Sequence, residues 1–249
     1  MILYGRNPVA EALRGRRAHT VGEIWATDGA RREPWLRRAE ANGVAVRAAS
    51  AVEVEGRCGS PAHQGVCARA GPYPYASAAS LLGVPEALLV ALDQVQDPQN
   101  LGSICRTAEC AGAAGVVIAE RRAAAVTPAV CKASAGAVEH LAVAQVRNVA
   151  DFLAEARRAG CWCYGASPRG RPGGPAPVPY DVPDYRGSAV VLVLGGEARG
   201  LRPRVAGACD ELVCLPLRGR SESLGVAAAA AALVYGILQR RSPGVDKNP

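Results

Sequence analysis

Short, almost wholly apolar runs alternate with helix-like stretches from residue 87 to residue 241. The predicted strands are residues 87–92, 116–119, 141–146, 161–166, 190–194 and 212–215. The predicted helices are the stretch that follows Asn100, then residues 128–137, 149–158 and 224–241. Strands that are apolar on both faces and are separated by helices are typical of a parallel sheet covered on both sides. We therefore predict an α/β fold for this part of the chain.

Residues 1–70 have the pattern of a smaller α/β unit. Its expected helices are residues 7–14 and 34–42, and its expected strands are residues 22–26, 44–48 and 64–69. The next stretch, 71–86, is rich in Gly, Pro and Ser, a composition that favours a linker. The predicted organisation is therefore a unit at 1–70, a linker at 71–86, a second unit at 87–242 and a tail at 243–249.

Positive charge is concentrated toward the N-terminal end. The chain has a net charge of +7, and residues 1–75 hold 11 Lys and Arg against 7 Asp and Glu. Many of these cations fall near predicted loops and helix ends: Arg6, Arg14, Arg16, Arg17, Arg31, Arg32, Arg37 and Arg38. Such a surface suits a polyanionic partner, whose phosphates it would neutralise. A solvated basic face would give the same composition.

Neither a membrane span nor a secretion signal is predicted. No run of about 18 apolar residues occurs, and the first residues lack both a basic segment and a long apolar segment. The nine cysteines include no CxxC pair. This pattern favours reduced thiols in a cytoplasmic protein over a zinc site or a disulfide framework.

The first candidate site segment runs from residue 92 to residue 112, LDQVQDPQNLGSICRTAECAG. Asp97 precedes a proline, which disfavours helical backbone there and predicts a turn. Asn100 is then expected to be the N-cap of a helix. Arg106 would lie within the first two turns of that helix. A polar loop, a helix start and an arginine together predict a site for an anionic or polar ligand.

The second segment, VLVLGGEARGL at residues 191–201, takes a buried strand directly into Gly195 and Gly196. Paired glycines allow a tight turn or the close approach of a ligand. Glu197 follows them as a polar candidate. The spacing is not the GxGxxG of a dinucleotide site, which argues against a nicotinamide oxidoreductase. An ordinary turn between strand and helix would also explain two glycines.

The third segment covers residues 212–236, where Pro216 ends a strand and a polar loop, RGRSES, leads to a helix expected to begin at Leu224. Ser223 could cap that helix. The free amides of the helix start could instead bind an anionic or carbonyl group. All three segments follow carboxyl ends of predicted parallel strands, where open sheets bind their ligands. We therefore expect them to converge on one crevice.

In order and spacing, the motifs DPQNLGSICRTAECAG, LVLGGEARGL and LPLRGRSESL resemble those of the SpoU (TrmH) family of RNA 2′-O-ribose methyltransferases in the SPOUT superfamily. The resemblance covers residues 88–240. Residues 1–70, which open with YGRNPVAEAL, resemble the ribosomal-protein-like substrate-binding domain of members that methylate a guanosine of 23S ribosomal RNA. The resemblance implies a SPOUT-type parallel sheet with a C-terminal trefoil knot, a cytoplasmic homodimer, RNA as partner, and no membrane or metal.

The resemblance also implies S-adenosylmethionine as cofactor. The positions carried over for it are Gly195, Gly196, Leu215, Leu217 and Leu224.

The implied catalytic residues are Arg106, Asn100, Glu197 and Ser223. Arginine has a pKa of about 12.5–13.8, so we expect Arg106 to hold the target phosphate and stabilise the developing alkoxide rather than act as a base. Asn100 would order the loop around Arg106, and Glu197 would fix the arginine or the second segment. Ser223 would donate to RNA or organise the knot. A buried structural ion pair between Arg106 and Glu197 is the alternative.

The chain departs from the family pattern in the third motif. Where the family has Ser-Leu-Asn-Val-Ser, this chain has Gly225 and Ala227 in place of the asparagine and the second serine. Catalysis would then depend on backbone groups at this loop. The alternatives to a ribosomal RNA enzyme are a transfer RNA enzyme, an enzyme for a resistance-linked ribosomal site, and a non-catalytic RNA-binding or ribosome-assembly protein.

Overall fold

The computed structural model describes residues 1–170, 174–197, 199–220 and 224–241. The predicted tail therefore lies outside the described residues. Contacts within the chain define two compact units. The N-terminal unit comprises Met1–Pro74 together with Ala125–His140, and the C-terminal unit comprises Tyr75–Ala124 and the chain from Leu141 onward.

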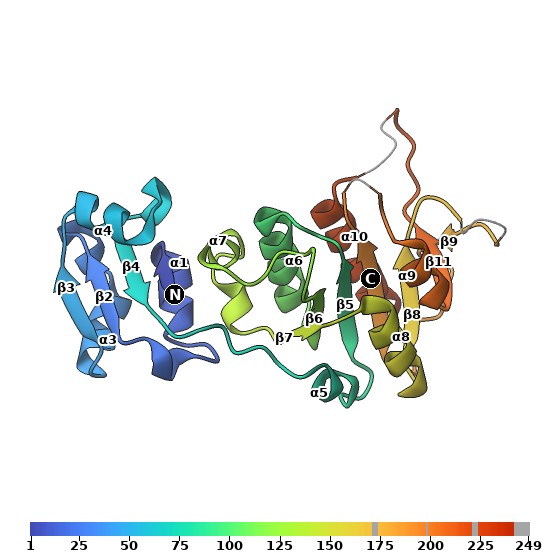
Figure 1. Ribbon diagram of the computed structural model, residues 1–249, viewed down its shortest axis with the longest axis horizontal. Coiled ribbons are helices and arrows are strands. Elements are labelled where there is room, and N and C mark those ends of the chain that lie inside the picture. Colours follow the sequence, from blue (N-terminus) through green and yellow to red (C-terminus); the bar gives the residue numbers. More distant parts are fainter. Residues whose placement is uncertain (171–173, 198, 221–223, 242–249) are drawn as a thin grey trace, which may run out of the picture. The chain divides into compact units, whose positions relative to one another are not determined.

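A four-stranded sheet forms the centre of the N-terminal unit, with strand order β1-β4-β2-β3 (Figure 1). The strands are β1 (Ile2–Tyr4), β2 (Glu23–Ala26), β3 (Ala45–Ala48) and β4 (Val66–Arg69). β4 is antiparallel to both of its neighbours, and β2 is parallel to β3. The helices from this stretch are α1 (Arg6–Ala12), α2 (Asp28–Arg31), α3 (Pro34–Ala41) and α4 (Ala51–Cys58), with 3-10 turns η1 (Ala18–Thr20) and η2 (Pro61–His63).

Two further elements of this unit come from far along the chain: α7 (Pro128–Ala133) and η3 (Ala137–Glu139). The sequence predicts one helix over residues 128–137, which is wrong at its end. Ala135 and Gly136 both have left-handed backbone, with φ of 52° and 88°. A left-handed residue ends an α-helix, so α7 stops before the short η3 turn.

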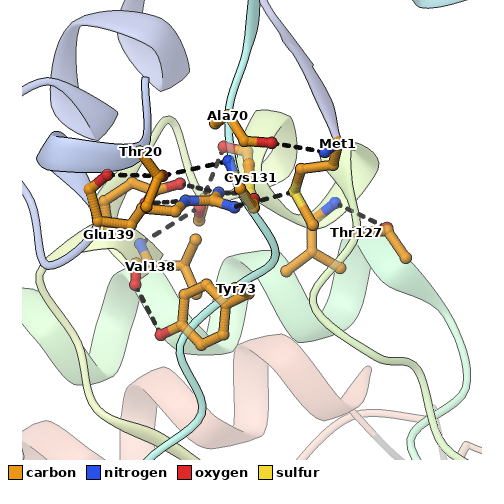
Figure 2. Close-up of polar contacts among 12 residues, drawn as sticks. Met1, Thr20, Ala70, Tyr73, Thr127, Cys131, Val138 and Glu139 are labelled. Atoms are coloured by element: carbon orange, nitrogen blue, oxygen red, sulfur yellow. Dashed lines mark hydrogen bonds and ion pairs between the residues drawn. The ribbon is translucent and has the colours of Figure 1, made fainter. Parts of the chain in front are cut away.

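A buried ion pair holds η3 within the N-terminal unit. The Arg17 guanidinium donates from Nη2 to Oε1 of Glu139 at 2.5 Å and from Nε to Oε2 at 2.8 Å. The two side chains are 1% and 0% exposed. Figure 2 shows the surrounding residues, including Tyr73, whose hydroxyl donates to the Val138 carbonyl at 2.9 Å.

The C-terminal unit is built on a parallel sheet of seven strands in the order β7-β6-β5-β10-β8-β11-β9. The strands are β5 (Leu88–Asp93), β6 (Gly115–Ala119), β7 (Val143–Val146), β8 (Trp162–Ala166), β9 (Val178–Pro179), β10 (Val190–Gly195) and β11 (Glu211–Cys214). The predicted α/β fold with a parallel sheet is confirmed. β10 comes late in the chain yet lies between β5 and β8.

Helices cover this sheet on both faces: α5 (Ala78–Leu82), α6 (Pro98–Cys110), α8 (Val149–Arg158), α9 (Pro203–Ala208) and α10 (Val226–Arg241). One core joins α8 and α9 to alternate strand residues such as Leu89 and Val191. The intervening residues face the other way because strand side chains alternate. α6 and α10 pack against each other and contact β6 and β10 (Figure 1). No helix of the described ranges is long and apolar enough to cross a membrane.

The stretch predicted as a linker, 71–86, contains ordered structure. The Ser77 hydroxyl caps α5 by accepting from the Ser80 amide at 3.1 Å. Leu81 is buried, and Ala76 forms a parallel bridge with Ala144 of β7. This stretch therefore adds a helix and an edge contact to the C-terminal unit.

Candidate functional site

The first site segment forms the start of α6. The Asp97 side chain caps the helix by accepting from the Gln99 amide at 2.9 Å, and Pro98 is the first helical residue. Proline is favoured at that position because it has no amide hydrogen to lose. The predicted N-cap at Asn100 is therefore wrong, since Asn100 is the third residue of the helix. Arg106 accordingly lies in the third turn and not in the first two.

The structure brings the first and second segments together through Asn100 and Glu197. The Asn100 Nδ2 donates to Glu197 Oε1 at 2.6 Å. Both residues are at least partly accessible to solvent. The contact joins a residue of α6 to the loop after β10, and β5 and β10 are neighbouring parallel strands. Two sequence-predicted site residues thus meet at the carboxyl edge of the sheet.

Arg106 is exposed, and its guanidinium makes no hydrogen bond or ion pair with any residue that the structure describes. It follows Asn100 by six residues, which places the two side chains about 120° apart around the helix axis. The alternative of a buried ion pair with Glu197 is therefore not what the structure contains. The guanidinium is available to an external anion.

The paired glycines are required by the packing of the chain itself. A Cβ on Gly195 would lie 2.1 Å from the carbonyl carbon of Gly200, and one on Gly196 would lie 2.5 Å from the Gln94 oxygen. Gly196 and Gly200 also form an antiparallel bridge. Any side chain at either position would displace backbone. The loop carrying Glu197 is thereby held against the loop that leads into α6.

The sequence does not predict an ion pair beneath this loop, between the buried Asp93 and the partly exposed Arg202. Asp93 is 0% exposed, and its Oδ1 accepts from the Arg202 Nε at 2.8 Å. Its Oδ2 accepts from the Arg202 backbone amide at 2.9 Å. An ionisable residue at the end of an apolar strand is an available signal, because a buried carboxylate needs a partner. The pair anchors the end of the glycine loop to β5.

The third segment offers apolar side chains to solvent. Leu215 is half-buried, whereas Leu217 and Leu224 are 40% and 48% exposed. Ser223 lies outside the described residues. The predicted helix start at Leu224 is wrong by two residues. α10 begins at Val226, and its first turn includes a bond from the Ala229 amide to the Gly225 carbonyl at 3.0 Å.

These three loops share one edge of the sheet because they follow β5, β10 and β11, which all run parallel. Together they offer exposed leucines, a carboxylate held at Glu197 and, at Arg106, an exposed guanidinium with no partner in the described ranges. Apolar walls with a few placed polar groups suit a small cofactor that has one apolar face. The described residues contain no cluster of three or more His, Cys, Asp or Glu that could hold a metal ion.

Two families match the chain over separate ranges. The SpoU rRNA Methylase family matches residues 87–235. The family described as RNA 2′-O ribose methyltransferase substrate binding matches residues 2–76. These ranges correspond to the two regions whose motifs carry the resemblance.

Relatives align along nearly the whole chain. A Staphylococcus haemolyticus protein, whose name places it in the TrmH family of tRNA/rRNA methyltransferases, is 32% identical over 97% of this chain and 96% of its own length. A Mycobacterium avium protein named as an uncharacterized tRNA/rRNA methyltransferase is 34% identical over 96% of this chain and 77% of its own length.

Solved structures share the fold. An AdoMet-bound rRNA methyltransferase from Sinorhizobium meliloti aligns with a TM-score of 0.78 at 25% identity, covering 96% of this chain and 86% of that one. The SpoU methyltransferase AviRb from Streptomyces viridochromogenes, in complex with AdoMet, has a TM-score of 0.78 at 23% identity, covering 98% and 91%.

Proposed function

This chain belongs to the SpoU (TrmH) family of RNA methyltransferases, and on that premise we propose that it methylates a ribose 2′-hydroxyl, with a guanosine of 23S ribosomal RNA as the target. The observation that carries the proposal is the Asn100–Glu197 contact, which joins two motif residues at the sheet edge, while the Arg106 guanidinium of the same helix has no partner among the described residues. A fixed polar pair and a free cation suit the alignment of a charged substrate.

S-adenosylmethionine is the proposed methyl donor, in keeping with the AdoMet-bound relatives of known structure. When bound, it supplies a sulfonium methyl group to a nucleophilic oxygen. The chain has groups that fit it: Leu217 and Leu224 are unusually exposed leucines that could cover an adenine. Gly195, Gly196 and Leu215 would offer backbone amides and carbonyls to its polar parts.

Arg106 has the central role in this proposal. A guanidinium carries five N–H donors and no acceptor, so we assign it a binding role toward anionic oxygens and not the role of a base. It can hold the phosphate beside the target ribose and stabilise negative charge that develops on the 2′-oxygen. Holding the nucleotide in line with the donor is itself a large part of such catalysis.

Asn100 and Glu197 are proposed to position rather than to react. The Asn100 amide holds the Glu197 carboxylate and so fixes the loop after β10 relative to α6. We assign Ser223 to contact RNA or to order the third loop.

The N-terminal unit is proposed to select the RNA. A folded accessory unit suits a structured RNA, which proteins recognise largely by shape and phosphate contacts. We propose residues 1–70 as its substrate-binding core and 71–86 as the connection. The proposed methyltransferase part is 87–242 without residues 125–140, which fold with the N-terminal unit. A trefoil knot at the C-terminal end, a homodimer and a cytoplasmic location complete the proposal.

The test uses methyl-labelled S-adenosylmethionine with unmodified ribosomal and transfer RNA pools, followed by digestion and identification of the labelled nucleoside. Label in 2′-O-methylguanosine from the large ribosomal RNA is the expected result. Label only in transfer RNA would contradict the proposed ribosomal RNA substrate. RNA binding without any label would favour the non-catalytic alternative that Gly225 and Ala227 raise.

A further inference from the structure

Four exposed arginines lie close together in the chain on α2 and α3 of the N-terminal unit. Arg31 is in the last turn of α2, Arg32 is its C-cap, and Arg37 and Arg38 lie on α3. All four are exposed. We call this set the arginine patch.

Six other arginines of this unit differ because their charges have partners. The ion pairs are Arg6 with Glu33, Arg14 with Glu11, Arg17 with Glu139, and both Arg47 and Arg69 with Glu23. Arg57 lies over the Trp25 ring at 4.3 Å from its centroid. In the described part of the chain, no carboxylate lies within ion-pair distance of the arginine patch.

The backbone beneath the patch is fixed. The Thr27 hydroxyl caps α2 by accepting from the Ala30 amide. The buried residues Leu36 and Ala39 hold one side of α3 against the unit. Arg37 and Arg38 therefore lie on the opposite, exposed side of the helix.

Charge in this stretch is positive even after its acidic residues are counted. Glu33, between the two helices, accepts from the Arg6 Nη1 at 2.7 Å and is thereby neutralised. Only Asp28 and Glu40 remain in residues 28–41 to oppose the four arginines. Cations near a helix C-terminus stabilise the helix dipole, typically by about 0.3–1 kcal/mol. That contribution explains single arginines such as Arg31 and Arg38 but not an adjacent unpaired set of four.

We propose that the arginine patch binds the phosphate backbone of the substrate RNA. The guanidinium fork matches phosphate oxygens in shape and charge, and four such groups within eight residues suit consecutive phosphates of a folded RNA. This inference rests on the proposed function for the identity of the polyanion. It adds the particular surface by which the N-terminal unit holds that RNA.

The experiment measures RNA binding at several salt concentrations with the full chain. One variant, Arg31→Gln/Arg32→Gln/Arg37→Gln/Arg38→Gln, removes the patch. A matched control, Arg6→Gln/Arg14→Gln/Arg47→Gln/Arg69→Gln, removes the same charge from exposed ion pairs of the same unit. The probes are unmodified large ribosomal RNA and a transfer RNA pool, and circular dichroism checks folding.

Each phosphate contact contributes about 0.7–0.9 to the slope of log affinity against log salt concentration. The patch variant is expected to lower that slope by about 2–3 and raise Kd at least about tenfold at low salt. The control is expected to change the slope by less than about 1, because its arginines already have carboxylate partners. Arg→Lys replacement of the patch should restore most of the slope.

Equal effects of the two variants would overturn the inference, because total charge and not the patch would then decide binding. An unchanged slope in the patch variant would also overturn it and would point to another kind of partner, such as an acidic protein. These outcomes are independent of methyl transfer. An absent methyl label with a patch-dependent slope would reject the proposed function and support the patch.

Discussion

Two polar clusters in this chain use the same residue types under opposite conditions. In the N-terminal unit, the Arg17–Glu139 pair is almost wholly buried, and the guanidinium also donates to the Gly71 carbonyl at 3.1 Å. In the C-terminal unit, the Asn100–Glu197 pair is accessible to solvent, and Arg106 has no partner among the described residues. Every donor of the Arg17 guanidinium is used, whereas the Arg106 guanidinium bonds to none of the residues that the structure describes.

This difference is the reason why we propose a structural role for Arg17 and a catalytic role for Arg106. Burial opposes the charge of Arg17, but its hydrogen bond and attraction to Glu139 prevail and raise the pKa of its guanidinium. Such a group has no bonding capacity left for a ligand. The Arg106 guanidinium, by contrast, donates to no described residue.

Arg17→Met should lower the free energy of unfolding by about 3–5 kcal/mol, because it leaves the Glu139 carboxylate buried without its counter-ion. Urea denaturation followed by circular dichroism measures the loss. The double variant Arg17→Met/Glu139→Leu should recover most of it, since an apolar pair carries no unpaired charge. If the single variant were as stable as the wild type, the pair would not be the structural element described here.

Arg106→Ala should slow methyl transfer by about 10²–10³-fold, equivalent to about 2.7–4 kcal/mol of transition-state stabilisation. Because the side chain is exposed, the free energy of unfolding should change by less than about 0.5 kcal/mol. Single-turnover assays with labelled S-adenosylmethionine measure the rate. Arg121→Ala, another exposed arginine of the same unit, serves as the control. Wild-type turnover in Arg106→Ala would remove this residue from the mechanism.

Asn100→Ala should reduce the rate of methyl transfer by about tenfold and stability by about 1 kcal/mol or less, because it deletes one accessible hydrogen bond. A double-mutant cycle with Glu197→Ala isolates the contact. A coupling energy of about 1 kcal/mol in the activation free energy is expected. Strictly additive effects would show that the 2.6 Å contact has no part in positioning the loop.

Gly225→Asn should have the smallest effect. A Cβ at this position would meet no atom within 4 Å, and asparagine exceeds glycine as a helix N-cap by only a few tenths of a kcal/mol. We expect slightly higher thermal stability and a Kd for S-adenosylmethionine within about twofold of the wild type, measured by calorimetry. A Kd about ten times lower would show that the missing amide is a cofactor contact.

Local patterns predict the sheet well because its strands are apolar on both faces, a signal that needs no knowledge of partners. They fail at helix ends. Asn100 is a residue type that caps helices, but Asp97 is the N-cap of α6, and Pro98 follows it as the first helical residue, so the helix begins earlier. The helix α4 is missed although Ser50 and Glu53 form a capping box that the sequence displays.

Long-range pairings cannot be read from local patterns. In the sequence, Arg17 resembles the other basic loop residues, because its carboxylate partner, Glu139, lies 122 positions later. The same is true of Asp93, whose partner is Arg202. The direct Asn100–Glu197 contact is not predicted either: the sheet geometry predicts that the two segments converge, but nothing near Asn100 indicates a partner 97 positions away.

Because residues 125–140 fold with the N-terminal unit, this unit is not encoded by one continuous stretch of the gene. Suppose that recombination exchanged only residues 2–76, the range that matches the substrate-binding family. Arg17 would then come from one parent and the residue at position 139 from the other. Unless that chain supplied a matching carboxylate, the hybrid would fold with a buried, unpaired cation. We therefore expect the residues at positions 17 and 139 to change together across related genomes. A graft of this unit onto another protein would need both segments, residues 1–74 and 125–140.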